Sequence, residues 1–282
     1  MNRILILALL LTLTLPDSAT LAQRPPNPLA NPPAQKAQTE LDKAVAERDQ
    51  LMKERKFAEA LAVARNVAEI LRKKKPDSLE LATALHQVGR AAYSRGQLPE
   101  AEAAWTEALA IREKLAPGSL PMADSLNNLG IVAASRGDLE LAQRRYEAAL
   151  ALYEKLAPGS LSVANSLNNL GAVTSDRGDL ELAQRRYEAA LAIREKLAPG
   201  SLDVAMSLNN LGLVASDRGD LELAQRRYEA ALALYEKLAP VSLDMANSLN
   251  NLGIVARDRG DLELAQRRYE AALALYEKLA PG

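Results

Sequence analysis

Pairs of asparagines recur at a fixed spacing along the chain. They lie inside four copies of the segment SLNNLG, which begin at Ser125, Ser166, Ser207 and Ser248. A side-chain amide both donates and accepts hydrogen bonds, so a row of amides on one wall can bind the backbone of an extended peptide without reading its side chains. Half-buried amides also need partners within the protein, which leaves bridging between neighbouring helices as the alternative role.

The segment that carries the asparagines differs between copies at a few positions, whereas the segment that follows it is almost constant. We therefore predict a groove with a constant amide row and variable specificity positions. The candidate groove residues are Gln87, Asn128, Asn169, Asn210, Asn251, Asn127, Asn168, Asn209, Asn250, Asn165, Met206, Asn247 and Arg257. One position of the second segment holds arginine or tyrosine, and we interpret these side chains as lying on the surface. They are Arg112, Tyr153, Arg194, Tyr235 and Tyr276.

Groups that could carry catalysis are scarce. His86 is the only histidine and the chain has no cysteine, so a metal site of His or Cys ligands cannot be assembled. We interpret His86 as a polar residue on an inner helix, because it aligns with Asn127. Glu140 stands four residues before Arg144, the spacing of a surface ion pair, and nothing suggests two unpaired carboxylates in a dry cleft. We predict no enzyme activity, no cofactor and no bound metal.

The repeating unit has a period of 41 residues (166−125, 207−166, 248−207), which indicates a stacked-repeat protein. In both segments of the unit, small and apolar residues recur at intervals of three and four, which predicts two helices rather than strands. Ser119 is expected to cap the first helix, Gly137 to end it in the left-handed conformation, and Asp138 to cap the second. Pro158 and Gly159 then end the second helix.

The small and apolar residues of the unit resemble the tetratricopeptide repeat. The matching positions are Leu126, Leu129, Gly130, Ala133, Ala142, Tyr146 and Ala149 and their later copies, with an earlier copy at Leu85, Val88, Gly89, Ala92, Ala101, Trp105 and Ala108. The usual unit has about 34 residues, and the longer unit here is similar to the kinesin-light-chain type. The resemblance implies an all-α, right-handed superhelical solenoid of antiparallel helix pairs, whose first helices line the inner wall and bind peptides.

The repeats divide the chain as follows. Residues 36–76 are predicted to form a degenerate first hairpin, because Phe57, Ala60 and Val67 align with later copies but Arg48 stands where Gly130 would be. Five good repeats are predicted at residues 77–117, 118–158, 159–199, 200–240 and 241–282.

Residues 1–22 have the pattern of a secretory signal peptide. Arg3 supplies a positive charge, Ile4–Leu15 is a run of apolar residues and Thr, and Ala22 ends a stretch of small residues suited to cleavage. We expect export to the periplasm or the extracellular space. Residues 23–35 are predicted to be a linker, because their proline density forbids a helix and favours polyproline II. A docking ligand of the PxxP type is the alternative.

The formal net charge is −1, so the chain lacks the positive charge that a nucleic-acid partner requires. We predict no membrane insertion after signal cleavage. The predicted function is a non-enzymatic scaffold that binds an extended peptide or a partner protein. The alternatives are a regulatory arm of a longer exported protein, since bacterial proteins that resemble this one often carry a caspase-like domain, and a purely structural spacer. The last repeat has no polar capping helix after it, which also suggests end-to-end self-association.

Overall fold

The computed structural model describes residues 32–279, and the side chains of residues 39–279. All regular secondary structure in this range is helical, which confirms the all-α prediction. The helices are α1 (Pro32–Lys53), α2 (Phe57–Lys74), α3 (Leu79–Ser94), α4 (Leu98–Leu115), α5 (Leu120–Ser135), α6 (Leu139–Leu156), α7 (Leu161–Asp176), α8 (Leu180–Leu197), α9 (Leu202–Asp217), α10 (Leu221–Leu238), α11 (Leu243–Asp258) and α12 (Leu262–Leu279). The predicted signal peptide and its cleavage site lie outside the described residues.

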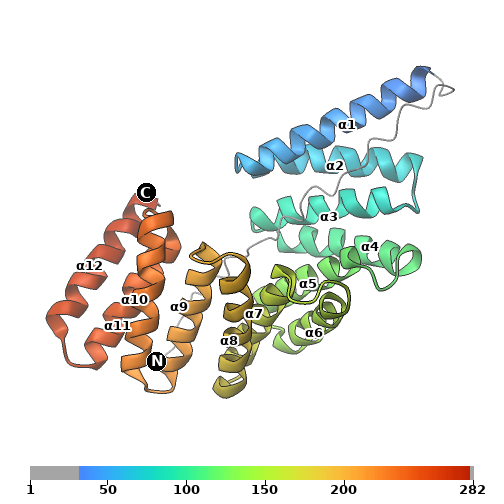
Figure 1. Ribbon diagram of the computed structural model, residues 1–282. Coiled ribbons are helices and arrows are strands. Elements are labelled where there is room, and N and C mark those ends of the chain that lie inside the picture. Colours follow the sequence, from blue (N-terminus) through green and yellow to red (C-terminus); the bar gives the residue numbers. More distant parts are fainter. Residues whose placement is uncertain (1–31, 280–282) are drawn as a thin grey trace. The chain divides into compact units, whose positions relative to one another are not determined.

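The helices form two compact units that divide after Leu156. We call α1–α6 the N-terminal unit and α7–α12 the C-terminal unit. Within each unit every helix packs against the next one in the chain, so that helical hairpins stack side by side (Figure 1). In the C-terminal unit the first helix α9 also contacts the first helices α7 and α11 directly. We call the surface of these three first helices the inner wall of this unit.

Local hydrogen bonds fix the ends of the helices. Ser119 Oγ accepts a hydrogen bond from the backbone N–H of Met122 at 3.4 Å where α5 begins. Asp138 Oδ1 accepts one from the N–H of Leu141 at 3.0 Å where α6 begins. Between the two helices Gly137 has a φ of +81°, in the left-handed region that glycine adopts without a Cβ clash. The predicted caps and the predicted turn are confirmed.

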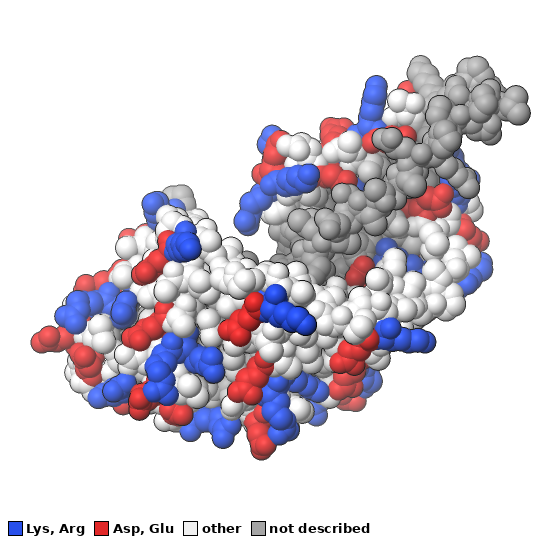
Figure 2. Space-filling view, in the orientation of Figure 1, with Lys and Arg blue, Asp and Glu red and all other residues white. Residues whose placement is uncertain are grey.

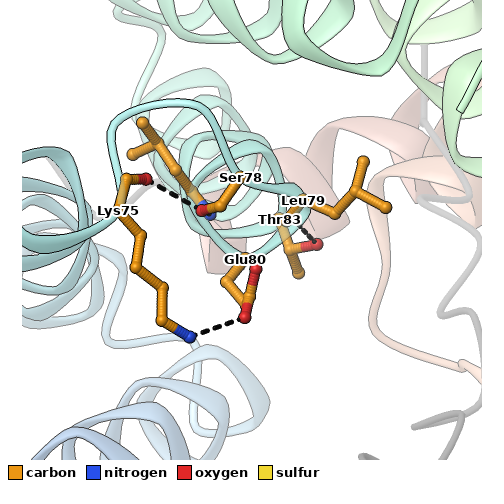
Figure 3. Close-up of polar contacts among 6 residues, drawn as sticks. Lys75, Ser78, Leu79, Glu80 and Thr83 are labelled. Atoms are coloured by element: carbon orange, nitrogen blue, oxygen red, sulfur yellow. Dashed lines mark hydrogen bonds and ion pairs between the residues drawn. The ribbon is translucent and has the colours of Figure 1, made fainter. Parts of the chain in front are cut away.

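The corner before α3 has no glycine, and side chains close it instead (Figure 3). Ser78 Oγ accepts a hydrogen bond from the N–H of Leu81 at 3.1 Å and donates one to the carbonyl of Lys75 at 2.9 Å. Lys75 Nζ also pairs with Glu80 at 2.7 Å across the same corner. The serine cap thus works without the Pro-Gly sequence that precedes it in three later hairpins.

Glycines let the two helices of each complete hairpin approach closely. A Cβ added at Gly212 on α9 would meet Cε1 of Tyr228 at 2.7 Å and Cδ1 at 2.8 Å, and the Tyr228 side chain on α10 is buried. Real Cβ atoms do not come this close to a ring carbon, so the aromatic ring occupies the space that glycine leaves. The equivalent pairs are Gly89 with Trp105, Gly130 with Tyr146, Gly171 with Tyr187 and Gly253 with Tyr269.

Helices α1 and α2 form a first hairpin in which this pairing is reversed. Arg48 is buried where the later hairpins have glycine, and Ala64 is buried where they have the aromatic residue. At these repeat positions the large side chain is therefore on the first helix and the small one on the second, and exchanges that keep the total volume are tolerated in cores. Arg48 also pairs with Asp49, with its guanidinium 2.6 Å from Oδ1.

The predicted linker is too long at its C-terminal end, because α1 begins at Pro32. Proline is tolerated in the first turn of a helix, since a backbone N–H there has no acceptor within the helix and the ring fixes φ near the helical value. The argument that proline forbids a helix therefore does not apply to Pro32 and Pro33.

Candidate functional site

The predicted groove residues all lie on first helices, in two separate units. Those of the N-terminal unit are Gln87 on α3 and Asn127 and Asn128 on α5. Those of the C-terminal unit are Asn165, Asn168 and Asn169 on α7, Met206, Asn209 and Asn210 on α9, and Asn247, Asn250, Asn251 and Arg257 on α11. Asn128, Asn165 and Asn168 are buried, Arg257 is exposed, and the others are half-buried. The C-terminal unit therefore carries most of the predicted amide row.

Two of these amides bridge neighbouring first helices. Asn210 Nδ2 on α9 donates a hydrogen bond to Asn168 Oδ1 on α7 at 3.0 Å. This contact is the bridging role that the sequence left open as the alternative to peptide binding. It uses one polar atom of each amide, so the second polar atom of each amide is not part of the bridge.

Arg194 lies beneath this amide pair. Its side chain is 0 % exposed, so the interpretation of the arginine position as a surface position is wrong. The reason is that this face of α8 is covered by both α7 and α9. Arg194 Nη2 donates to Asn165 Oδ1 at 2.7 Å. Nη1 donates to Ser207 Oγ at 2.7 Å and to the Asp203 carbonyl at 3.1 Å, and lies 3.4 Å from Asn168 Oδ1.

Tyrosine at the equivalent position of two other hairpins is also bonded within its hairpin. Tyr153 donates to Asp124 Oδ1 at 2.6 Å, and Tyr276 donates to Asn247 Oδ1 at 2.6 Å. These acceptors occupy the position of Asn165, which the sequence assigned to variable groove specificity. Burial raises the pKa of the Asp124 carboxyl, and the Tyr153 hydroxyl opposes this. Residues at this position thus bond within their own hairpin, which is a structural role beside the predicted groove role.

Arg112 in the N-terminal unit repeats the arrangement of Arg194. Its Nη1 donates to Ser125 Oγ at 2.7 Å and to the Pro121 carbonyl at 2.7 Å, and it lies 3.3 Å from Nδ1 of His86. His86 occupies the position that Asn168 has in the C-terminal unit. Both arginines thus approach the acceptor atom of the same repeat position.

His86 is held as a neutral acceptor. Its ring is buried, and burial lowers the pKa of His86 well below its usual range, with Arg112, Arg90 and Arg48 adding to the effect. Since the guanidinium of Arg112 can only donate, Nδ1 accepts and the proton of the neutral ring lies on Nε2. The sequence interpretation of His86 as a polar residue of a first helix agrees with this environment.

The low pKa of His86 predicts a loss of stability in mild acid. Below the unfolded-state pKa of about 6.5 the unfolded chain binds a proton that the folded chain does not, so the free energy of unfolding falls by about 1.4 kcal/mol per pH unit. His86→Asn places the amide of the other hairpins opposite Arg112 and removes this contribution. Urea unfolding at pH 7.5 and 5.5 measures it, and equal pH dependence in both proteins would contradict the assignment.

The outer helices carry a network of exposed ion pairs. Arg144 pairs with Glu140 at 2.5 Å on α6, which confirms the predicted surface pair. Positive and negative side chains are interspersed over the face seen in Figure 2. Among the residues that the structure describes, no group of three His, Asp or Glu side chains could hold a metal ion.

Arg112 and Arg194 are buried, although we interpreted both from the sequence as surface residues. Three hairpins have a hydrogen bond between positions 29 residues apart (194−165, 153−124, 276−247). The sequence does not mark this contact, because asparagine stands opposite arginine in one hairpin and opposite tyrosine in another.

The stacked hairpins define a class of helical-repeat protein, and the sequence places the chain in one family of that class. A tetratricopeptide repeat model matches residues 121–196 and 203–278, more than half of the chain, and a second tetratricopeptide repeat model matches residues 81–116. The chain belongs to the tetratricopeptide repeat family. A search among curated proteins gave no match.

Solved structures share the fold at low sequence identity. BtubC (BKLC) from P. vanneervenii is 23% identical, with 85% of this chain and 92% of that chain covered and a TM-score of 0.64. The apo form of RapI is 14% identical, with 86% and 100% covered and a TM-score of 0.66. A Podospora anserina chain described as a kinesin light chain with nearly identical tetratricopeptide-like repeats is 20% identical, with 71% and 97% covered and a TM-score of 0.58. No helix within residues 32–279 has the length and hydropathy to span a membrane.

Proposed function

We propose that this protein is a non-enzymatic scaffold that binds an extended peptide, or an extended segment of a partner protein, on the inner wall of its first helices. The family supports a scaffold that binds proteins. The observation that favours an extended peptide is the amide row on α7, α9 and α11, whose side chains are buried or half-buried and include both donors and acceptors. Backbone groups of an extended chain need such partners.

Alanine at Asn169 and Asn210 tests this proposal. The double variant removes two half-buried amides of adjacent hairpins, and each lost hydrogen bond to a ligand is expected to weaken binding by about 1 kcal/mol. Affinity for a peptide selected from a display library of linear dodecapeptides should therefore fall by about 30-fold. Circular dichroism should show unchanged helix content.

A matched control distinguishes the inner wall from the outer helices. Gln184 and Gln225 are amides on α8 and α10 that accept hydrogen bonds from Arg218 at 2.7 Å and Arg259 at 2.6 Å. Alanine at both should leave peptide affinity unchanged. Equal loss of affinity in the two double variants would remove the amide row from the binding surface, and a library without any binder would favour a structural spacer.

The outer face of α12 supports a second proposal, self-association. Helices α10 and α12 have the same sequence, but Leu232 on α10 is 5 % exposed beneath α11, whereas the equivalent Leu273 on α12 is 55 % exposed. Leu262 and Leu273 flank an apolar hollow beside Tyr269. We propose that this face packs against the same face of a second copy, and light scattering of the purified chain at increasing concentration distinguishes a dimer from a monomer.

Export remains a proposal that rests on residues 1–22 of the sequence, which lie outside the described residues. We propose that the scaffold binds its partner outside the cytoplasm. A regulatory arm of a longer exported protein would use the same inner wall.

A further inference from the structure

The hydrogen bonds of Asn168 leave only its donor side available. Asn168 Oδ1 accepts from Asn210 Nδ2 at 3.0 Å and lies 3.4 Å from Nη1 of Arg194. An amide oxygen has two lone pairs, and both are directed at these donors. Asn168 Nδ2 has no hydrogen-bond partner among the described residues, and this nitrogen is accessible to solvent rather than buried. The side chain therefore offers N–H groups, and no acceptor, to whatever lies on the inner wall.

Asn210 offers the complementary group. Because its Nδ2 donates to Asn168, its Oδ1 is the atom left over. This oxygen is likewise accessible to solvent rather than buried. The bonded pair thus presents one donor from α7 beside one acceptor from α9. A backbone peptide unit has one acceptor and one donor, so the pair is chemically complementary to it.

Arg194 explains the polarity of this pair, by which we mean that the Asn168 oxygen faces inward and its NH₂ group faces outward. A guanidinium only donates hydrogen bonds, and it is buried beside the Asn168 oxygen, where electrostatic interactions are stronger than in water. If the Asn168 amide turned over, its NH₂ group would face both Arg194 and the Asn210 NH₂ group, with donors on both sides and no acceptor. The arginine therefore holds the oxygen inward and the NH₂ group outward.

The next hairpin shows the arrangement without an arginine. Tyr235 replaces Arg194, and Asn209 occupies the position of Asn168. Asn209 Oδ1 is buried and has no hydrogen-bond partner within the part of the chain that the structure describes. Turning this amide over would exchange an unpaired acceptor for an unpaired donor, so nothing in this hairpin selects one orientation. The fixed polarity is a property of the hairpin that contains Arg194.

We propose that Arg194 is a positioning residue that fixes the polarity of the Asn168–Asn210 pair, and that this pair binds one backbone peptide unit of an extended ligand. Asn168 Nδ2 donates to a ligand carbonyl, and Asn210 Oδ1 accepts from a ligand N–H. The proposal rests on the peptide-binding function proposed above. It adds a specificity, because a proline or an N-methylated residue has no N–H and is rejected at the bound position.

The chain supplies the variant that tests the arginine. Arg194→Tyr, with Asn165 retained, recreates the Tyr276–Asn247 pair of the last hairpin, which is hydrogen-bonded at 2.6 Å. The variant keeps a large buried side chain and loses the guanidinium donors to Asn168. It is expected to fold with the helix content of the wild type.

The first measurement needs no ligand. In ¹⁵N-labelled protein, the side-chain NH₂ signals of Asn168 should exchange readily with water, because the NH₂ group faces outward. Strong protection of these protons from exchange would mean that the amide points the other way, toward the buried guanidinium, and would overturn the inference while leaving the proposed function standing.

The second measurement uses a dodecapeptide selected on the wild type and synthesised with each backbone N–H methylated in turn. We expect one position at which methylation lowers wild-type affinity at least tenfold, and at which it lowers the affinity of Asn210→Ala less than threefold. Arg194→Tyr should bind the parent peptide about tenfold more weakly and show a reduced penalty at that position. Full affinity and an unchanged penalty in Arg194→Tyr would overturn the positioning role. Failure of the wild type to bind any library peptide would overturn the proposed function itself.

Discussion

Gly212→Val lowers the free energy of unfolding by about 3 kcal/mol. Overpacked cores lose about 1–3 kcal/mol or more, and this site is at the upper end, because even a Cβ atom would lie 2.7 Å from Cε1 of Tyr228. The ring cannot move away, since it is buried between α9 and α10. Valine adds two further methyl groups at the same crossing. Urea unfolding followed by far-UV circular dichroism measures the effect.

Two matched variants separate overpacking from other consequences of losing a glycine. Gly219→Asn changes a glycine that has a φ of +81° and, among the described residues, no heavy atom within 4 Å of an added Cβ. It should cost less than about 1 kcal/mol because Asn tolerates this conformation. Tyr228→Ala in the Gly212→Val background should restore part of the loss, as the Arg48 and Ala64 pair of the first hairpin illustrates. Equal effects at Gly212 and Gly219 would refute the close crossing.

Arg194→Ala is the second change with a large expected effect, a loss of about 3 kcal/mol. Removing one partner of a buried charged network costs about 3–5 kcal/mol, and each acceptor left unpaired costs about 1–3 kcal/mol. The variant leaves Asn165 Oδ1 and Ser207 Oγ without their 2.7 Å donors. It also empties the space of a fully buried side chain.

Arg194→Tyr is the control for that loss. Tyrosine occupies this position in three other hairpins, where it is buried or half-buried, so we expect a change of less than about 1 kcal/mol. Both variants are compared with the wild type by urea unfolding at one pH. Equal destabilisation by alanine and tyrosine would contradict the expectation that a tyrosine bonded to Asn165 can replace the arginine.

The sequence predicts most of the fold because the relevant chemistry is local. A serine or aspartate at a helix start bonds to an N–H only a few residues away, as Ser119 and Asp138 do. Glycine at a turn has the left-handed φ wherever the chain must reverse, as at Gly137. The predicted helix pairs depend on such short-range rules together with apolar periodicity.

The burial of Arg112 and Arg194 could not be obtained by the same rules. Periodicity shows which face of α8 is apolar, but whether the next first helix covers the arginine depends on packing between hairpins. Arginine is almost never fully buried unless it is paired, and the acceptors of Arg194 come from two neighbouring first helices, α7 and α9. Arginine side chains are usually exposed, which is why we expected both arginines on the surface, but in this structure both are buried.

The sequence predicts on which helices the candidate groove residues lie, but not the contacts that they make. The sequence correctly placed the amides on first helices, because the repeat period aligns them. It could not show that Asn168 and Asn210 bond to each other or that a buried cation lies behind them, since hydrogen bonds between side chains of different helices depend on distances that a repeat pattern does not contain. Those contacts orient the side-chain amides of Asn168 and Asn210.

Binding on the inner wall is the central claim, and side-chain amide signals test it most directly. We would record ¹H–¹⁵N spectra of the chain while adding the selected dodecapeptide. Binding on the inner wall predicts shifts in the NH₂ signals of Asn168 and Asn210, with those of Gln184 and Gln225 on the outer helices unchanged. Shifts confined to the outer glutamines would contradict binding on the inner wall.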